Sequence, residues 1–172
     1  TEGLFDCRED IDNIFGNLDF KNKTVLNLGQ STGYLNFAAE ERGADVTSID
    51  LDVNSTERDW VPRVNEDWKK DLKQFMDDER RRRNAFWYAH KALNSKSKLI
   101  ISHINNLPKE VGKYDIGLMF SVLVHIRDPF LALQRMLSHI SEKVEITELG
   151  GYTVRKTLLN FVPNLFNKFY SK

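Results

Sequence analysis

The sequence predicts an α/β fold of the Rossmann-like type, with an open, mostly parallel sheet and helices on both faces. Two observations support this prediction. Short apolar segments typical of buried strands alternate along the chain with segments of helical spacing. The first apolar segment also ends in a glycine that leads directly into a helical pattern. The length of 172 residues suits a single domain, residues 1–172.

A βαβ unit accounts for residues 23–52. The segment KTVLNLG, residues 23–29, has the short apolar centre of a buried parallel strand and ends in glycine. Residues 32–43 follow with apolar side chains at helical spacing, and Gly43 is placed to end the helix. Residues 44–52 are rich enough in β-branched side chains to form the next strand.

The chain after this unit continues the alternation. Residues 53–95 are charged and aromatic, and we expect a helical insertion or lid there, with its helix within 64–93. Three further apolar segments complete the expected sheet, at residues 97–104, 113–126 and 142–149.

A last helix is expected over residues 128–140, where Asp128 precedes Pro129. Aspartate is a favoured N-cap, and proline suits the first position of a helix. Residues 1–20 form an N-terminal segment compatible with a short helix. The fifth strand runs abruptly into two glycines at 149–151, which indicates missing loop residues, and the chain beyond has room for one more strand and a helix.

Composition limits the partners that the protein can have. Lys plus Arg and Asp plus Glu number 25 each, so no overall field attracts nucleic acid or an anionic membrane. The single cysteine, Cys7, rules out an internal disulfide. The sequence shows no charged-then-apolar leader and no apolar run of membrane-spanning length, so we expect a cytoplasmic protein.

The loops that follow the expected strands define the candidate site. In an open parallel sheet, ligands bind beyond the carboxyl ends of the strands. The loops expected to converge there are residues 29–33, 50–52, 104–106 and 121–125. In a Rossmann-like fold this is the place of a nucleotide cofactor.

The turn after the first strand excludes two kinds of nucleotide site. A dinucleotide-binding turn has glycine at its first, third and sixth positions, which here are Gly29, Ser31 and Tyr34. A phosphate-binding loop has a lysine and a hydroxyl residue after its last glycine, and Gly33 is followed by Tyr34 and Leu35. What remains is a glycine, three residues and a second glycine.

Asp50 stands at the end of the second expected strand. A carboxylate at this point can accept hydrogen bonds from both hydroxyls of a ribose. With the glycine turn, it favours a nucleoside that lacks a pyrophosphate. A tight turn and a solvated strand end would use the same residues, so the spacing alone leaves both interpretations open.

Two segments carry a resemblance to a known family. The segment VLNLGQSTGYLNFAAEERGADVTSIDL resembles the first two motifs of class I S-adenosylmethionine-dependent methyltransferases. It is closest to the branch of tRNA wobble-uridine methyltransferases and carboxymethyltransferases. The segment YDIGLMFSVLVHIRDPFLALQRM is similar to a second pattern of that branch. The resemblance covers about residues 20–149 and implies the class I methyltransferase fold, with S-adenosylmethionine or a close analogue as cofactor.

The resemblance also implies which residues bind the cofactor. They would be Asn27, Gly29, Gln30, Ser31, Thr32, Gly33, Asp50, Leu51, Ile104, Asn105 and Ser121. The turn would line the methionine and ribose, Asp50 would hold the ribose, and Leu51 would pack on the adenine. The family usually has an acid where this chain has Asn27, and an acid is common near Asn105. An amide accepts hydrogen bonds but does not offset the positive charges of the cofactor, so affinity could be lower.

His125 is the candidate catalytic residue. Methyl transfer from a positive sulfur needs alignment and a place for the proton of the nucleophile, and no covalent residue. The resemblance and its position after the fourth strand put His125 near the transferred group. A histidine that caps the next helix or bonds to Asp128 is an equally good interpretation. His90, His103 and His139 show no ligand spacing with Cys7, so we expect no metal site.

The expected insertion carries the residues that would contact an RNA acceptor. These are the run Arg80–Arg83 with Lys69, Lys70 and Lys73, and the aromatic residues Trp60, Trp68, Trp87 and Tyr88. Such residues can bind phosphates and stack on bases. Asp77, Asp78 and Glu79 adjoin the arginines, however, and a solvated helix face is the favoured interpretation. The aromatic residues are then packing residues.

The sequence therefore predicts methyl transfer from S-adenosylmethionine to an unidentified acceptor, either a tRNA base or a small molecule. The alternative is a non-catalytic cofactor-binding or protein-interaction module of the same fold. No membrane and no metal partner are expected. The sequence does not define the oligomeric state.

Overall fold

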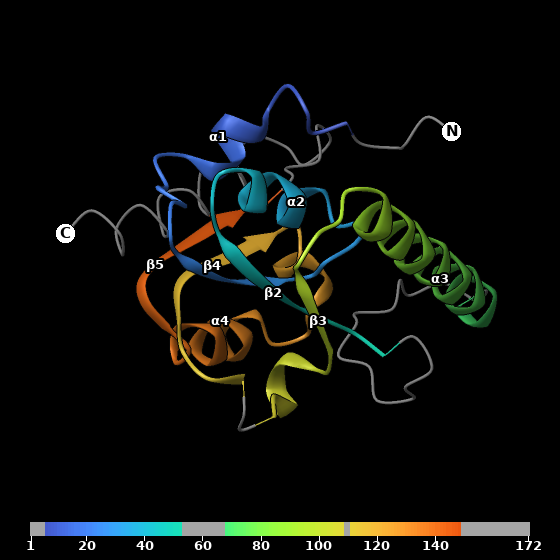
Figure 1. The fold of residues 1–172 in the computed structure, drawn as a ribbon. Coiled ribbons are helices and arrows are strands. Elements are labelled where there is room, and N and C mark those ends of the chain that lie inside the picture. The colour runs from blue at the N-terminus through green and yellow to red at the C-terminus, as the bar shows by residue number, and fades with distance from the viewer. Residues whose placement is uncertain (1–5, 53–67, 109–110, 149–172) are drawn as a thin grey trace.

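A computed structural model describes residues 6–52, 68–108 and 111–148. Five strands form one sheet in the order β3-β2-β1-β4-β5, and every pair is parallel. The strands are β1 (Thr24–Leu28), β2 (Asp45–Asp50), β3 (Lys98–Ile101), β4 (Tyr114–Phe120) and β5 (Ile140–Thr147). Figure 1 shows the sheet at the centre of the molecule. The predicted Rossmann-like α/β fold is confirmed.

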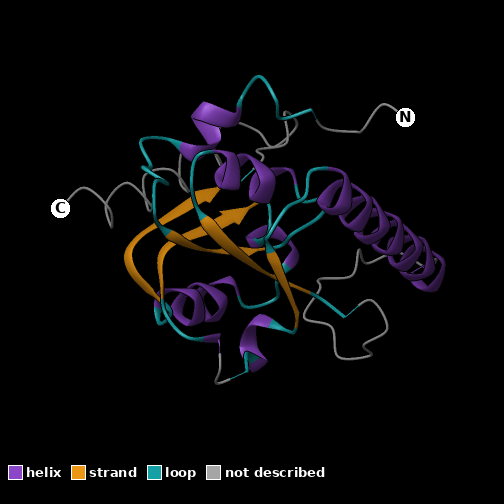
Figure 2. Cartoon of the chain, in the orientation of Figure 1, coloured by secondary structure: helices purple, strands orange, loops and turns teal. Residues whose placement is uncertain are grey.

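Helices cover both faces of the sheet, as Figure 2 shows. The helices are α1 (Ile11–Phe15), α2 (Tyr34–Glu41), α3 (Trp68–Ala92) and α4 (Pro129–Leu137). Two single-turn 3₁₀ helices, η1 (Ile104–Asn106) and η3 (Leu123–His125), follow β3 and β4. None of the helices in the described part of the chain is long and apolar enough to cross a membrane.

Alternating side chains of the strands build two hydrophobic cores. On β1, Val25 joins the core under α1 and α2, while Leu26 and Leu28 join the core under α4. This division follows from strand geometry, because successive side chains point to opposite faces. Both faces of β1 are buried, which explains why its sequence is almost continuously apolar.

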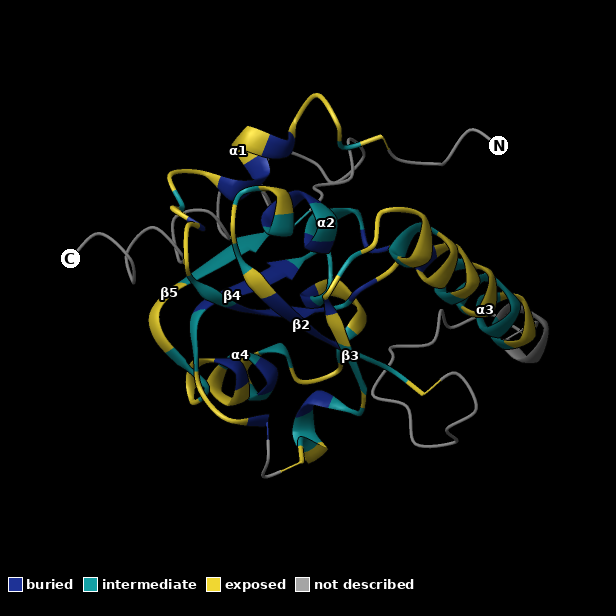
Figure 3. Ribbon diagram, viewed as in Figure 1, coloured by how far each residue is buried: buried dark blue, intermediate teal, exposed yellow. Residues whose placement is uncertain are grey.

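The helix α3 is the crossover between the parallel strands β2 and β3. Its carboxyl-terminal part packs on the domain. Phe86 is fully buried and stacks on Phe37 of α2, with the ring centroids 5.6 Å apart. The described side chains that precede Phe86 in α3 are exposed or half-buried, and Figures 1 and 3 show this part of the helix extending away from the sheet.

Several elements begin or end a few residues from their expected limits. The helix α4 ends at Leu137 and β5 already begins at Ile140, two residues before the expected start. In the N-terminal segment α1 has only five residues and ends at Phe15, with Gly16 as its C-cap. The expected features at 149–151, and the strand and helix beyond them, lie outside the described residues.

The start of α4 provides a test of the fold. The Asp128 Oδ1 accepts a hydrogen bond from Leu131 N at 2.9 Å, and Pro129 occupies the first turn. We expect Asp128→Ala to lower the free energy of unfolding by about 1 kcal/mol, measured by urea denaturation. Asp128→Ser keeps a capping oxygen and should cost much less. Equal losses in the two variants would show that the cap does not stabilise α4.

Candidate functional site

The four expected loops lie at one edge of the sheet, where the parallel strands end. Main-chain hydrogen bonds join neighbouring strand ends at this edge. Gly29 N donates to Ile49 O at 2.9 Å, which places the turn after β1 against the end of β2. Ser102 N donates to Asp50 O at 2.9 Å, and Ser121 N donates to Thr147 O at 2.8 Å. The arrowheads of β4 and β5 in Figure 1 point toward this edge.

The glycines of the turn are required by packing. Gly29 has φ 83° and Gly33 has φ 86°, in the region that favours glycine. A Cβ at Gly29 would lie 2.5 Å from Val122 Cγ2, and one at Gly33 would lie 2.4 Å from Phe86 Cδ2. The turn is therefore pressed between the loop after β4 and the helix α3. Tight packing accounts for both glycines without a ligand.

Two serines at this edge have a strained backbone. Ser31 in the turn and Ser121 after β4 both have φ 52°, which is uncommon for residues other than glycine. Such strain is often found at binding sites, where the surrounding structure imposes it. Ser31 is exposed and Ser121 is half-buried.

A buried chain of polar side chains lies beneath the turn. Asn27 is fully buried, and its Nδ2 donates to Asn36 Oδ1 at 2.8 Å and to Gly29 O at 3.3 Å. Asn36 Nδ2 donates in turn to Ser48 Oγ at 2.6 Å. An aspartate in place of Asn27 has no N–H to donate to Gly29. Asn36 and Ser48 were not expected in the site, although Asn36 is a polar residue among the apolar residues of its helix.

Two acceptors of the turn have no donor among the described residues. They are Asn27 Oδ1 and Gln30 Oε1, and both atoms are buried. Gln30 is only 3% exposed, and its Nε2 makes a long hydrogen bond of 3.4 Å to Ser31 O. A buried acceptor without a donor costs about 1–3 kcal/mol. A ligand with N–H groups at the turn would recover part of this cost.

Asp50 is a desolvated carboxylate at the end of β2. Its side chain is 13% exposed, and its Oδ1 accepts a hydrogen bond from Leu51 N at 2.9 Å. Burial raises the pKa of Asp50 from 3.8 to about 6, and the negative charge of Glu79 adds to this rise. The Leu51 hydrogen bond and the charges of Arg83 and Arg82 lower the pKa and only partly compensate.

The helix α3 reaches Asp50 through Arg83. Its Nη2 lies 3.9 Å from Asp50 Oδ2 and donates a hydrogen bond to the main-chain oxygen of Leu51. The arginine side chain is 18% exposed, so the ion pair is largely screened from water. The sequence predicts Arg83 only as part of the charged run Arg80–Arg83, because nothing local in the sequence links it to Asp50.

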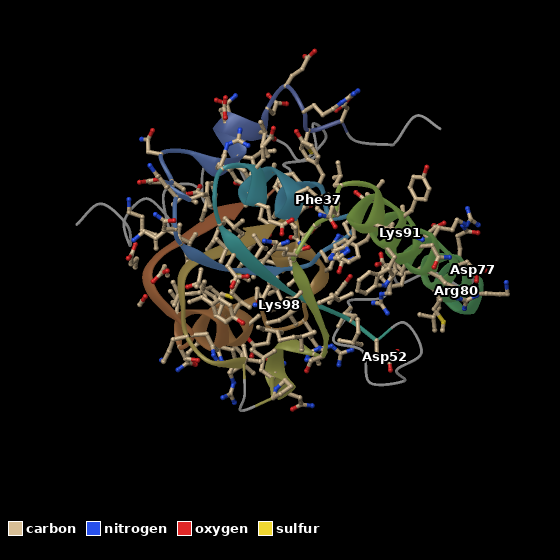
Figure 4. The ribbon with its side chains drawn as sticks, in the orientation of Figure 1. Phe37, Asp52, Asp77, Arg80, Lys91 and Lys98 are labelled. Atoms are coloured by element: carbon tan, nitrogen blue, oxygen red, sulfur yellow. The ribbon has the colours of Figure 1, made fainter. Side chains whose placement is uncertain are left out.

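Each arginine of the run has an acidic partner. Arg80 pairs with Asp77 at 3.5 Å, Arg81 with Asp78 at 3.6 Å, Arg82 with Glu79, and Arg83 with Asp50 at 3.9 Å. Figure 4 shows Asp77 and Arg80 together on the part of α3 that extends away from the sheet. The partners neutralise much of the positive charge of the run. This supports the interpretation of a solvated, acid-paired helix face.

The aromatic residues expected on this segment differ in their surroundings. Trp87 contacts the rings of Phe86 and His90 of its own helix, with centroids 4.8 Å and 5.3 Å away, and is 48% exposed. Tyr88 is 80% exposed. The side chains of Lys69, Lys70 and Trp68 and the whole of Trp60 lie outside the described residues.

The loop that carries His125 is anchored from β5. Glu148 accepts hydrogen bonds from Val122 N at 3.1 Å and from Leu123 N at 2.8 Å. Burial raises the pKa of Glu148, which was not expected in the site. His125 ends η3 and is exposed to solvent.

The remaining candidates also lie at the carboxyl edge. Leu51 is half-buried after β2, Ile104 is buried in η1, and Thr32 is exposed in the turn. Asn105 N donates to His103 Nδ1 at 3.1 Å, which orders the start of η1. Among the described residues, no three His, Cys, Asp or Glu side chains gather as a metal site requires.

Comparison with known proteins gives a fold and no sequence family. No protein-family model matches the chain, and no curated protein matches it. Magnesium protoporphyrin IX methyltransferase from Synechocystis, solved with bound S-adenosylhomocysteine, superposes with TM-score 0.54 at 17% identity. The alignment covers 96% of this chain and 70% of that one.

Two other solved structures have a similar fold. The N-terminal domain of EvdMO1, solved with S-adenosylhomocysteine and D-fucose, gives TM-score 0.54 at 13% identity, over 84% of this chain and 50% of that one. A Rhodobacter sphaeroides protein assigned to the Zn-dependent alcohol dehydrogenases gives TM-score 0.53 at 21% identity. The alignment covers 92% of this chain and 54% of that one. The chain therefore spans about half the length of these two proteins. The likeness shows a Rossmann-like fold of the kind found in methyltransferases.

The close approach of α3 to the turn can be tested with an alanine. We expect Gly33→Ala to lower the free energy of unfolding by about 3 kcal/mol, because the added Cβ would overlap the Phe86 ring at a positive φ. Gly43→Ala has a similar φ penalty, but its Cβ would be no nearer than 3.3 Å to another atom. We expect Gly43→Ala to lower the free energy of unfolding by about 1 kcal/mol. Urea denaturation measures both variants. Equal costs would contradict the role of Phe86.

Because Asp50 is desolvated, we expect removal of its charge to raise the free energy of unfolding, by an amount that depends on pH. Its folded-state pKa of about 6 lies above its ordinary 3.8, so ionisation costs stability as the pH rises through this interval and the full cost remains above it. We expect Asp50→Asn to be more stable than the wild type by about 2–3 kcal/mol at about pH 8 and nearly equal at about pH 4. Urea denaturation at both pH values measures this difference.

The matched control is Asp45→Asn, at the exposed start of the same strand, where the carboxylate pairs with Lys98 at 3.2 Å. This variant should show no gain at either pH. An Asp50→Asn protein that is no more stable than the wild type at about pH 8 would contradict the desolvation of Asp50.

Proposed function

We propose that this chain binds S-adenosylmethionine at the carboxyl edge of its sheet and transfers the methyl group to an acceptor. The observation that carries the proposal is the desolvated carboxylate of Asp50 beside the glycine turn. A buried carboxylate that its own protein stabilises only in part is a candidate for a functional site. The fold supports this position, because Rossmann-like proteins bind nucleotides there.

The residues at this edge fit a nucleoside cofactor with a positive amino acid end. Asp50 would accept hydrogen bonds from the ribose, with Leu51 against the adenine and Ile104 and Asn105 at its border. The turn residues would line the methionine end, where the buried acceptors Asn27 Oδ1 and Gln30 Oε1 suit an ammonium group. The turn lacks the third glycine of a dinucleotide site, which favours this cofactor over a nicotinamide dinucleotide.

The cofactor supplies an electrophilic methyl group on a positive sulfur. The protein must hold an acceptor in line with that methyl group and accept the proton that the acceptor loses. We propose His125 for the proton, because it is exposed on a loop that Glu148 anchors. Ser121, at the start of the same loop, would lie beneath the reacting end.

The acceptor that we propose to test first is a small molecule. Since every arginine of the run Arg80–Arg83 has an acidic partner, this run does not support a phosphate-binding surface for tRNA. Val124 and Phe130, on either side of His125 in the sequence, are 56% and 68% exposed. Exposed apolar side chains at this place would suit an acceptor with apolar surface.

A cofactor-binding module without catalysis is the second candidate. Asn27 favours it, because the family has an acid at this position that would offset the positive charge of the cofactor. Here the amide instead holds the turn through Gly29 and Asn36. A protein that binds S-adenosylhomocysteine as tightly as S-adenosylmethionine, and transfers no methyl group to any acceptor in a broad screen, would fit this candidate.

Calorimetric titration with S-adenosylmethionine and S-adenosylhomocysteine tests the proposal. We expect both to bind the wild type and Asp50→Ala to weaken binding at least tenfold, or by about 1.4 kcal/mol, because the ribose hydroxyls lose their acceptor. Asp45→Ala removes an exposed acid from the other end of β2 and should leave the affinity unchanged. Absence of binding to a folded wild-type protein would contradict the proposal.

A further inference from the structure

Arg83 makes two contacts with the end of β2, and the proposed function uses neither. One nitrogen, Nη2, both donates to the main-chain oxygen of Leu51 and lies 3.9 Å from Asp50 Oδ2. The residues that this arginine contacts are those proposed to hold the ribose and the adenine. The helix α3 is therefore coupled to the nucleoside subsite through one side chain.

The charges around Asp50 oppose one another. From α3, Arg83 and Arg82 favour the ionised carboxylate, while Glu79 disfavours it. From its own strand the carboxylate accepts the Leu51 N–H. The segment after β3 contributes the main-chain contact of Ser102, and titratable His103 follows it in the sequence. After β2 ends at Asp50, the next titratable group along the chain is Asp52, which is exposed.

We propose that Arg83 is a positioning residue of the nucleoside subsite, which fixes the end of β2 through Leu51 and keeps the Asp50 carboxylate charged. This inference rests on the proposed function. A carboxylate can accept from both ribose hydroxyls, whereas a protonated carboxyl loses part of its acceptor capacity. Nucleoside affinity should therefore depend on pH, and Arg83 should set the pH at which it changes.

The expected pH dependence follows from the charge of Asp50. The pKa of this group is about 6, so S-adenosylhomocysteine affinity should fall by up to about tenfold per pH unit below that value and be level above about pH 7. Removal of the arginine charge in Arg83→Gln should raise the pH below which the affinity falls. Removal of the acid in Glu79→Gln should lower that pH. Opposite shifts from two residues of one helix are not the result of general damage.

The experiment combines calorimetry with a direct titration of Asp50. Affinity for S-adenosylhomocysteine is measured from about pH 5 to about pH 8.5 in the wild type, Arg83→Gln, Arg83→Lys and Glu79→Gln. The ionisation of Asp50 is followed in the ligand-free proteins by NMR of carboxyl-labelled aspartate, assigned with Asp50→Asn. The control is Arg80→Gln. Arg80 pairs with Asp77 at 3.5 Å on the part of α3 that extends away from the sheet, so this variant should leave both readouts unchanged.

Arg83→Lys separates charge from geometry. Lysine keeps the positive charge but lacks the planar fork of arginine, so the Asp50 titration should stay nearer to that of the wild type than in Arg83→Gln. Its affinity above about pH 7 should still be lower than that of the wild type, because the contact with Leu51 is lost. If Arg83→Gln does not fold, Arg83→Lys and Glu79→Gln still test the inference.

Two results would overturn the inference. One is a pKa of Asp50, from the NMR titration, that is the same in Arg83→Gln and Glu79→Gln as in the wild type. The other is an affinity loss in Arg83→Gln that is the same at every pH. Absence of S-adenosylhomocysteine binding to the wild type at all pH values is a different result, because it contradicts the proposed function and the ligand part of this inference while the NMR titration still reports on the ion pair.

Discussion

The parallel pairing of β1 with β2 on one side and β4 on the other is the constraint on which the rest of the structure depends. Residues Val25 to Leu28 pair with both neighbours, so the three strands end together. This brings the glycine turn, Asp50 and the His125 loop to one edge, although they are far apart in the sequence. The turn is then so close to α3 and to the loop after β4 that Gly29 and Gly33 have no space for a side chain.

The same arrangement places groups at this edge at a cost to stability. The Asp50 side chain is only 13% exposed and its partner is 3.9 Å away, while two amide oxygens beneath the turn have no donor among the described residues. A fold selected for stability alone would replace such groups by apolar ones or pair them fully. They gather at the edge where Rossmann-like folds bind ligands, and this is the physical basis of the ligand site proposed there.

The sequence predicted the parts of the structure that depend on local patterns. The apolar segments, the glycine after β1 and the Asp128 cap are each defined within a few residues. The glycine and the cap were found where expected, and the strands lie within a few residues of their expected limits. The contacts that define the site join distant residues: Arg83 bonds to Leu51, 32 positions away, and Leu123 to Glu148, 25 positions away. Neither pair has a local signal, because periodicity describes which face a residue occupies and not which side chain it meets.

The structure changes the weight of the individual clues to function. The glycine turn supported a nucleoside site from the sequence, but Val122 and Phe86 alone are sufficient reason for its two glycines. Asp50 has no such internal explanation, since a buried carboxylate weakens the domain and Arg83 offsets that loss only in part. Asp50 and its ion pair, rather than the turn, are therefore the main support for the proposed ribose site. The ion pair also makes α3 part of that proposed site, where the sequence alone predicted a helical insertion or lid.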